Sequence, residues 1–207
     1  MHSGVIVAGG RSTRFGDADK AVAPLAGTPM VRRVAERIEP VVEELVVNGR
    51  PDQMSALRDA MAGYGLEVLY AEDERVDRGP MAGIRNGLRA ADGEYAFVVA
   101  CDMPFVSPDL AAFLFERATG HDAAIPRTDD GWYQTTQAVY RADAMADACE
   151  AALADGERRI VAPIERLDDV VEVSEDEISA VASMDSFENV NTREEFEDAA
   201  RRIGGGE

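Results

Sequence analysis

Short apolar runs alternate with amphipathic stretches along most of this chain, and this alternation constrains the fold more than any other feature. A run of about four to eight apolar residues predicts a buried strand, whereas apolar residues spaced three or four apart predict a helix with one buried face. Strands that alternate with helices favour a mostly parallel sheet covered on both faces. We therefore predict an α/β fold in a single domain over 1–207, because no Pro/Gly/Ser-rich linker divides the chain.

The pattern also places the individual elements. Ser107 is expected to cap a helix that begins with Pro108, and Thr192 with Glu195 forms a capping-box pattern at the last helix. The segment 95–101 (YAFVVAC) is the most apolar strand and is expected at the centre of the sheet. Strands are predicted at 5–8, 44–48, 66–70, 95–101, 123–126, 136–140 and 170–173, the last at an edge, and helices at 30–38, 52–62, 80–91, 108–118, 142–154 and 192–203.

The charge of the chain is strongly negative. It has 40 acidic and 21 basic residues, for a net charge of −19, and Lys20 is the only lysine. Such a surface repels nucleic acid and anionic membranes, so we expect neither as a main partner. Dispersed acidity with little lysine suits a high-salt, halophilic cytoplasm, although biased genomic base composition would also replace lysine with arginine. Residues 1–37 carry six bases and three acids, and this positive island predicts an anionic ligand.

Nothing in the sequence points to export or to a membrane. The start of the chain, 1–4, lacks the basic region and long apolar stretch of a secretion signal. No segment approaches the run of about 18 apolar residues that a membrane helix needs. Cys101 and Cys149 fit no metal-ligand spacing, so we expect two ordinary thiols in a reduced, cytoplasmic protein.

A glycine-rich loop follows the first predicted strand. It reads A-G-G-R-S-T-R-F-G at 8–16, with Asp19 and Lys20 close behind. Glycines let backbone N–H groups approach phosphate oxygens, and Arg14 and Lys20 can neutralise those oxygens. The loop is neither a Walker A loop nor a G-x-G-x-x-G dinucleotide fingerprint. The positive island and the placement of the only lysine here favour a phosphate site over a merely flexible loop.

A carboxylate follows the most apolar strand, in the motif C-D-M-P-F at 101–105. Ligands of parallel sheets bind outside the carboxyl ends of the strands. Asp102 is therefore well placed to hold Mg²⁺, which takes oxygen ligands and usually bridges to phosphate. A turn or N-cap aspartate is an equally good interpretation of this motif taken alone.

Three further motifs have structural as well as functional interpretations. G-P-M-A-G at 79–83 permits close approach of a ligand or tight packing of a helix on the sheet at Gly83. In G-E-R-R at 156–159, the pair Arg158 and Arg159 is open to a phosphate of a second substrate, or forms a surface charge cluster. The asparagines of N-V-N-T at 189–192 suit caps and turns.

Taken together, these motifs resemble those of the molybdenum cofactor guanylyltransferases, within a wider group of Rossmann-like nucleotidyltransferases. The order matches from 5 to about 196, including V-V-N at 46–48 and E-D at 72–73. The first loop and C-D-M-P are shared with the wider group and indicate nucleotidyl transfer, whereas G-P-M-A-G, G-E-R-R and N-V-N-T favour the molybdenum family. Val7 and Met81 stand where that family usually has leucine. The region 127–137, where the second substrate should bind, matches poorly.

The resemblance implies a Rossmann-like fold, a bound GTP and a Mg²⁺ ion held by Asp102. It implies catalytic roles for Lys20, Arg14 and Asp102. The nucleotide contacts that it implies are Val7, Ala8, Gly9, Gly10, Lys20, Asn48, Asp73 and Asp102.

The implied reaction joins GMP from GTP to the terminal phosphate of molybdopterin, or of its molybdenum-loaded form, and pyrophosphate leaves. A phosphate monoester with a second pKa near ~6 is mostly a dianion at neutral pH, so it needs no side-chain base. His2 and His121 indeed lie outside every motif. Catalysis is expected to rest on positioning and charge neutralisation, with Lys20 and Arg14 on phosphates and Mg²⁺ on Asp102 between the α-phosphate and the attacking oxygen.

Two alternatives remain open at this stage. One is a sister transferase that acts on adenosylcobinamide phosphate, phospholactate or a sugar phosphate. The other is a non-catalytic nucleotide-sensing module, since a fold does not fix a function, although intact Lys20 and Asp102 argue against it. For the protein itself we expect a monomer or weak oligomer with transient contacts to molybdenum cofactor enzymes.

Overall fold

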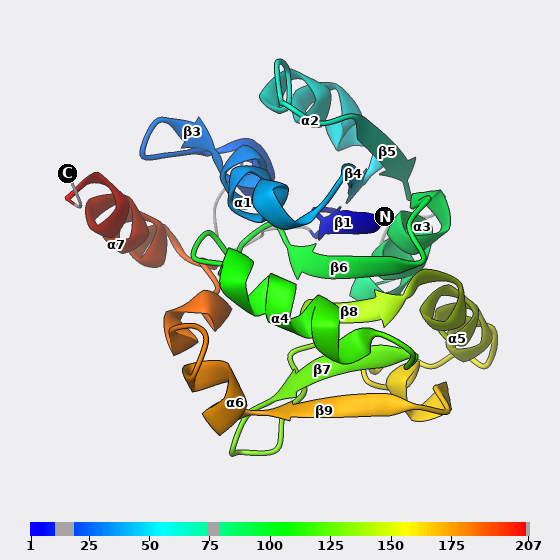
Figure 1. Ribbon diagram of the computed structural model, residues 1–207. Coiled ribbons are helices and arrows are strands. Elements are labelled where there is room, and N and C mark those ends of the chain that lie inside the picture. Colours follow the sequence, from blue (N-terminus) through cyan, green and yellow to red (C-terminus); the bar gives the residue numbers. More distant parts are fainter. Residues whose placement is uncertain (11–18, 74–78, 206–207) are drawn as a thin grey trace.

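The computed structural model describes residues 1–10, 19–73 and 79–205, and a seven-stranded sheet forms its centre (Figure 1). The strand order is β5-β4-β1-β6-β8-β7-β9, so the most apolar strand, β6, is central as predicted. Only β8 runs antiparallel to its neighbours, which confirms a mostly parallel sheet. The strands of this sheet are β1 (His2–Val7), β4 (Glu44–Gly49), β5 (Val68–Glu72), β6 (Tyr95–Ala100), β7 (Ala123–Arg127), β8 (Gln137–Arg141) and β9 (Val170–Ser174).

Helices cover both faces of the sheet, as the alternating pattern predicts. One apolar core joins the sheet to α1, α2, α4 and α6, and a second core joins its other face to α3 and α5. Figure 1 shows α4 in front of the sheet and α7 projecting to one side, with the C-terminus at its outer end. No described helix is long and apolar enough to cross a membrane. The helices are α1 (Met30–Ile38), α2 (Met54–Ala60), α3 (Pro80–Ala90), α4 (Pro108–Ala118), α5 (Ala142–Ala154), α6 (Glu175–Ser179) and α7 (Arg193–Gly204).

The local signals for helix starts are confirmed. Helices α1, α4 and α5 have the predicted bounds. The Ser107 hydroxyl accepts the Leu110 N–H at 3.3 Å. The Thr192 hydroxyl accepts the Glu195 N–H at 3.2 Å, and the Glu195 carboxylate accepts the Thr192 N–H at 2.9 Å. Both caps satisfy N–H groups that the first helical turn leaves without a partner.

Two small elements are missing from the predicted pattern. The first is a hairpin of β2 (Pro24–Leu25) and β3 (Thr28–Pro29), whose turn places Ala26 at φ 46° and Gly27 at φ 82°. A two-residue turn of this hand normally uses Asn or Gly at both positions, so alanine at the first position conceals it. The second is the single-turn helix α6, which is too short to show a helical period, although Ser174 and Glu177 form a capping box at its start.

Candidate active site

The candidate site lies at the carboxyl edge of the parallel half of the sheet, where β1, β4, β5 and β6 end. The Cys101 N–H donates to the Val7 carbonyl at 3.1 Å, and the Ala8 N–H donates to the Asn48 carbonyl at 2.9 Å. Beyond β5, the Asp73 N–H donates back to the last residue of β4 at 2.9 Å. The segments that follow the four strands are therefore held side by side, at the edge where α/β sheets bind their ligands.

A buried ion pair joins the two motifs that the sequence singles out. Lys20 is only 6% exposed, and its Nζ lies 2.8 Å from Asp102 Oδ2 and 3.2 Å from Asn191 Oδ1. The Asp102 carbonyl also accepts the Val190 N–H at 2.9 Å, so the N-V-N-T segment contacts the site directly. The second carboxylate oxygen, Asp102 Oδ1, is buried and has no hydrogen-bond partner in the described part of the chain. A buried acceptor without a partner is costly, so Asp102 Oδ1, unpaired in the described structure, is the feature that supports a bound ligand, and the role of Asp102 stays a prediction.

Asn48 and Asp73 form a second polar group at the same edge. Asn48 is fully buried, and its Nδ2 donates to the Ala71 carbonyl at 3.0 Å and to Asp73 Oδ1 at 2.9 Å. Asn86, on α3, donates to the same carboxylate oxygen at 3.1 Å. Asn48 Oδ1 has no partner among residues 1–10, 19–73 and 79–205. The group thus fixes Asp73 by two donors and leaves one buried acceptor, Asn48 Oδ1, unpaired.

Glycines let the surrounding segments approach these side chains closely. A Cβ at Gly9 would lie 2.5 Å from Asp73 Oδ2. A Cβ at Gly83 would lie 2.4 Å from Asn48 Oδ1 and 3.0 Å from Val7 Cγ1. Real Cβ atoms essentially never approach other atoms below 3.0 Å, so a larger residue at either position would force Asp73 or Asn48 to shift. Gly83 therefore serves the packing of α3 on the sheet, which is the structural one of its two predicted interpretations.

Sequence reasoning missed a supporting network behind the glycine segment. Arg50 Nη1 donates to the Gly10 carbonyl at 2.9 Å, and Gln53 Nε2 donates to the Ala8 carbonyl at 3.3 Å and to the Asp19 carboxylate. Only a helix start could be recognised here from sequence, because the contacts join positions 34 residues or more apart. The network fixes the backbone on both sides of the loop, before Gly10 and at Asp19.

The other predicted site residues are less closely connected to the site. Arg14 lies outside the described residues. Arg159 is paired with Glu165, with Nη1 to Oε1 at 3.1 Å, whereas Arg158 is exposed. The described contacts of this arginine pair include none with Lys20 or Asp102, so its role as a phosphate receptor stays a prediction.

The thiols and histidines lie outside the proposed chemistry. Burial raises the pKa of Cys101 and of Cys149, the latter to about 12, so both remain protonated thiols at neutral pH. His121 Nδ1 lies 2.8 Å from Asp169 Oδ2, and His2 stacks on an aromatic ring of α4. In residues 1–10, 19–73 and 79–205, no group of three or more His, Cys, Asp or Glu side chains is arranged to hold a metal ion.

The fold and this edge of the sheet together define a class of protein, the nucleotidyltransferases with a Rossmann-like fold. A family model described as the MobA-like NTP transferase domain matches residues 4–170. The chain belongs to this family.

Relatives support the assignment over nearly the whole length. The chain is 49% identical to a protein from Natronomonas pharaonis named "Probable molybdenum cofactor guanylyltransferase", over 97% of this chain and 98% of the relative. It is 37% identical to a protein of the same name from Haloferax mediterranei, over 92% and 89% of the two chains. Among solved structures, molybdopterin-guanine dinucleotide biosynthesis protein A from Archaeoglobus fulgidus superposes with a TM-score of 0.78 at 28% identity, over 98% and 99% of the chains.

Proposed function

We propose that this chain is a molybdenum cofactor guanylyltransferase. It transfers GMP from GTP to the terminal phosphate of molybdopterin, or of its molybdenum-loaded form, and releases pyrophosphate. The observation that carries the reaction class is the buried Lys20–Asp102 pair beside the glycine segment. The names of the relatives support the acceptor, because they match over almost the full length of the chain.

The residues at the site fit a magnesium ion. Mg²⁺ is usually bound through one or two carboxylates together with substrate phosphates. Asp102 Oδ1 is buried and unpaired within the described residues, while Oδ2 is already held by Lys20. Asp102 would hold the ion, which would supply charge neutralisation at the reacting phosphates.

The remaining side chains act by binding and orientation. Lys20 places one positive charge beside Asp102, and Arg14 adds a second charge to the phosphates. Guanine presents N–H donors on its base-pairing edge, and the Asp73 carboxylate suits those donors, while the buried Asn48 holds that carboxylate in place. The acceptor substrate brings its own dianionic phosphate, so no protein group needs to remove a proton. The proposed rate enhancement comes from positioning and electrostatics.

Pyrophosphate release with a panel of nucleotides and acceptors tests the proposal. We expect turnover with GTP and molybdopterin and little with ATP or CTP, since a site that hydrogen-bonds one base leaves groups unpaired with another. Equal turnover of GTP and CTP would contradict the guanylyl assignment. Turnover only with adenosylcobinamide phosphate, phospholactate or a sugar phosphate would identify a sister transferase. Binding of GTP without turnover on any acceptor would identify a sensing module.

The same proposal includes the setting of the enzyme. It works in the cytoplasm as a monomer or weak oligomer and contacts molybdenum cofactor enzymes transiently. Both cysteines are buried and unpaired, as is typical of a reducing compartment. Light scattering after size-exclusion chromatography measures the oligomeric state. A stable assembly of four or more copies would contradict the proposal of a monomer or weak oligomer.

A further inference from the structure

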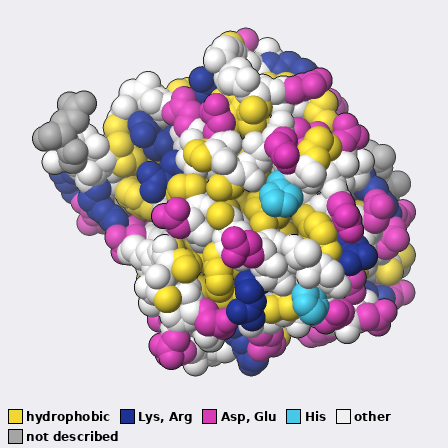
Figure 2. Space-filling view, in the orientation of Figure 1, with side chains coloured by type: hydrophobic (Ala, Val, Ile, Leu, Met, Phe, Trp, Pro, Cys, Tyr) yellow, Lys and Arg dark blue, Asp and Glu magenta, His cyan; other side chains and the backbone are white. Residues whose placement is uncertain are grey.

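We propose a second anion-binding site, for a phosphate group, in a cavity between α1, the 104–105 segment and the end of α7. The cavity has a volume of about 370 Å³, within the range of small-ligand pockets. Its walls include Arg33 and Arg37 from α1, Phe105 from the segment after Asp102, and Arg202 from α7. In Figure 2, basic side chains gather beside apolar ones on the surface between α1 and α7.

The charges at this cavity are unusual for so acidic a chain. Many described arginines pair with a carboxylate, but Arg33 and Arg37 bond only to backbone carbonyls within the described residues. Arg33 donates to the Leu25 carbonyl from Nε at 3.2 Å and from Nη2 at 2.7 Å, and Arg37 Nε donates to the Val106 carbonyl at 2.7 Å. These bonds orient both guanidinium groups but neutralise neither charge. Arg33 Nη2 also donates to the Ala26 carbonyl at 3.3 Å, so within the described residues Arg33 keeps its Nη1 donors, and Arg37 its Nη1 and Nη2 donors, available for an anion.

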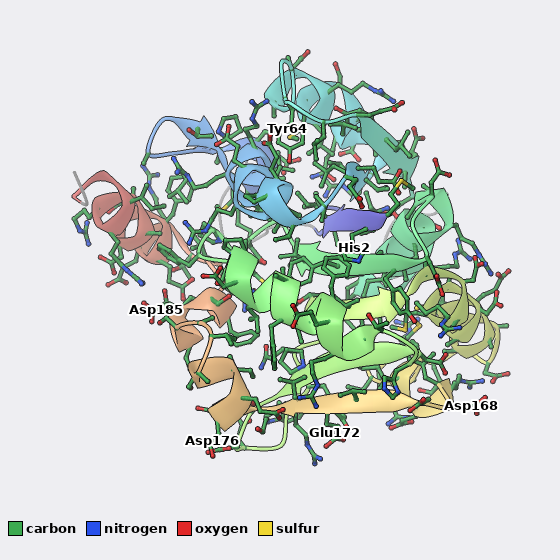
Figure 3. All side chains as sticks on the ribbon, in the orientation of Figure 1. His2, Tyr64, Asp168, Glu172, Asp176 and Asp185 are labelled. Carbon is green, nitrogen blue, oxygen red and sulfur yellow. The ribbon has the colours of Figure 1, made fainter. Side chains whose placement is uncertain are left out.

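The other charged groups that line the cavity already have partners. Glu36 accepts from Arg32 Nε at 2.7 Å. Arg202 Nη2 donates to Asp185 at 2.8 Å, and its guanidinium lies 4.1 Å from the centre of the Phe105 ring. Asp185, labelled in Figure 3, lies beneath α7 in that view. The excess charge at the cavity thus comes from Arg33 and Arg37.

The electrostatics agree with this geometry. Desolvation, and then the positive charge of Arg33, lower the pKa of the Arg37 guanidinium. The two like charges therefore repel each other, and a bound dianion would relieve that repulsion. Phosphate matches the guanidinium forks in shape and charge, and the Phe105 and Ile203 side chains offer apolar contact to the body of a phosphate ester.

This cavity is separate from the nucleotide site but shares two elements with it. Phe105 follows Asp102 in the C-D-M-P-F motif, and Arg202 lies on α7, whose N-terminal end follows Asn191. A ligand in the cavity would contact both elements. The inference does not depend on the acceptor or on the guanylyl specificity of the proposed reaction.

Calorimetric titration with inorganic phosphate, inorganic pyrophosphate and GMP tests the site. The variants are Arg33→Gln/Arg37→Gln, the charge-matched control Arg58→Gln/Arg166→Gln, and Lys20→Gln to weaken the nucleotide site. Circular dichroism in the same potassium salt monitors folding. Arg37→Gln alone provides a milder variant if the double variant fails to fold.

We expect Lys20→Gln and the control to retain a site that binds pyrophosphate, and we expect removal of Arg33 and Arg37 to weaken it at least about tenfold. If Arg33→Gln/Arg37→Gln loses the same affinity for phosphate, pyrophosphate and GMP, the site recognises the phosphate group itself. If GMP binds more tightly than phosphate and pyrophosphate, the site recognises phosphate esters. Unchanged stoichiometry and affinity in folded Arg33→Gln/Arg37→Gln or folded Arg37→Gln would overturn the proposal. If only Lys20→Gln loses GTP turnover, that result bears on the proposed function and not on the second anion site.

Discussion

The carboxyl edge of the parallel half of the sheet and the opposite edge strand, β9, differ in how their polar side chains are held. At the ends of β5, β4, β1 and β6, Asn48 is fully buried and Lys20 is 6% exposed. In the β8-β7-β9 half, Arg127 pairs with Glu172 on the exposed edge strand, and Trp132 is 69% exposed. Figure 3 shows Glu172 and Asp168 along this edge.

The difference indicates which part of this fold carries the function. A buried polar group costs free energy unless it is paired, so a concentration of such groups indicates a site that other requirements maintain. Exposed ion pairs contribute little to stability, and charges on an edge strand also discourage pairing with another chain. We therefore expect substitutions at the carboxyl edge of the first half to change catalysis and those at exposed positions of the second half to change stability slightly.

The largest expected effect is that of Asp102→Asn. Asparagine keeps the shape of the side chain but removes the charge that pairs with Lys20 and would hold Mg²⁺. We expect turnover to fall by about 10³-fold or more, with an unchanged circular dichroism spectrum. Asp168→Asn, on the other half, is the matched control and should retain full activity. Activity of Asp102→Asn within a few-fold of the parent enzyme would remove Asp102 from the mechanism.

Lys20→Arg comes next, because it keeps the charge and changes the shape. The bulkier, planar guanidinium cannot occupy the buried position between Asp102 and Asn191 as a single ammonium does. We expect turnover to fall by about 10²-fold at saturating GTP. Arg166→Lys makes the reverse exchange in the second half and should be neutral. Near-normal turnover of Lys20→Arg would mean that the ion pair is only structural.

Gly83→Ala tests the packing beneath the first half. The new Cβ would lie 2.4 Å from Asn48 Oδ1, so α3 or the asparagine must move. We expect a loss of about 1–3 kcal/mol of stability, together with a higher KM for GTP. In Gly204→Ala the new Cβ meets nothing within 4 Å, so that variant should be as stable as the parent. Equal melting temperatures for the two variants would contradict the close approach at Gly83.

Salt should affect the acidic surface of both halves together. The net charge is −19, and the Debye length falls from about 10 Å at 0.1 M to about 3 Å at 1 M salt. Screening weakens repulsion between acidic groups, so the melting temperature should rise by several degrees up to molar KCl. A melting temperature that stays flat or falls over this range would count against a halophilic adaptation.

The smallest expected effect is on the edge strand. The Tyr133 hydroxyl, followed by Arg127, lowers the pKa of Glu172. A carboxylate with a lowered folded-state pKa stabilises the fold above its unfolded pKa of about 4.3, and this contribution disappears as the pH falls through the folded value. The melting temperature should therefore fall less in Glu172→Gln than in the parent protein when the pH drops below about 5. The difference should be only about 1–2 °C, because the carboxylate is half exposed. A larger change would mean that the edge strand stabilises the sheet more than exposed ion pairs normally do.

The sequence alone predicted the order of the seven strands of the main sheet and of six of the helices, while the β2-β3 hairpin and α6 were missed. Apolar periodicity and caps act within a few residues, so α1, α4 and α5, and the caps at Ser107 and Thr192, could be predicted directly. Lys20 and Asp102 could also be selected, because a sole lysine and a carboxylate after a buried strand are visible without a structure.

Which of these residues meet depends on how the whole chain packs. The direction of β8 was hidden because a buried strand has the same apolar pattern whether it runs parallel or antiparallel. The Lys20–Asp102 pair spans 82 positions, and the contacts of Arg50 with the glycine segment span at least 40. Such pairings follow from strand order and close packing, which depend on the whole core rather than on any local segment.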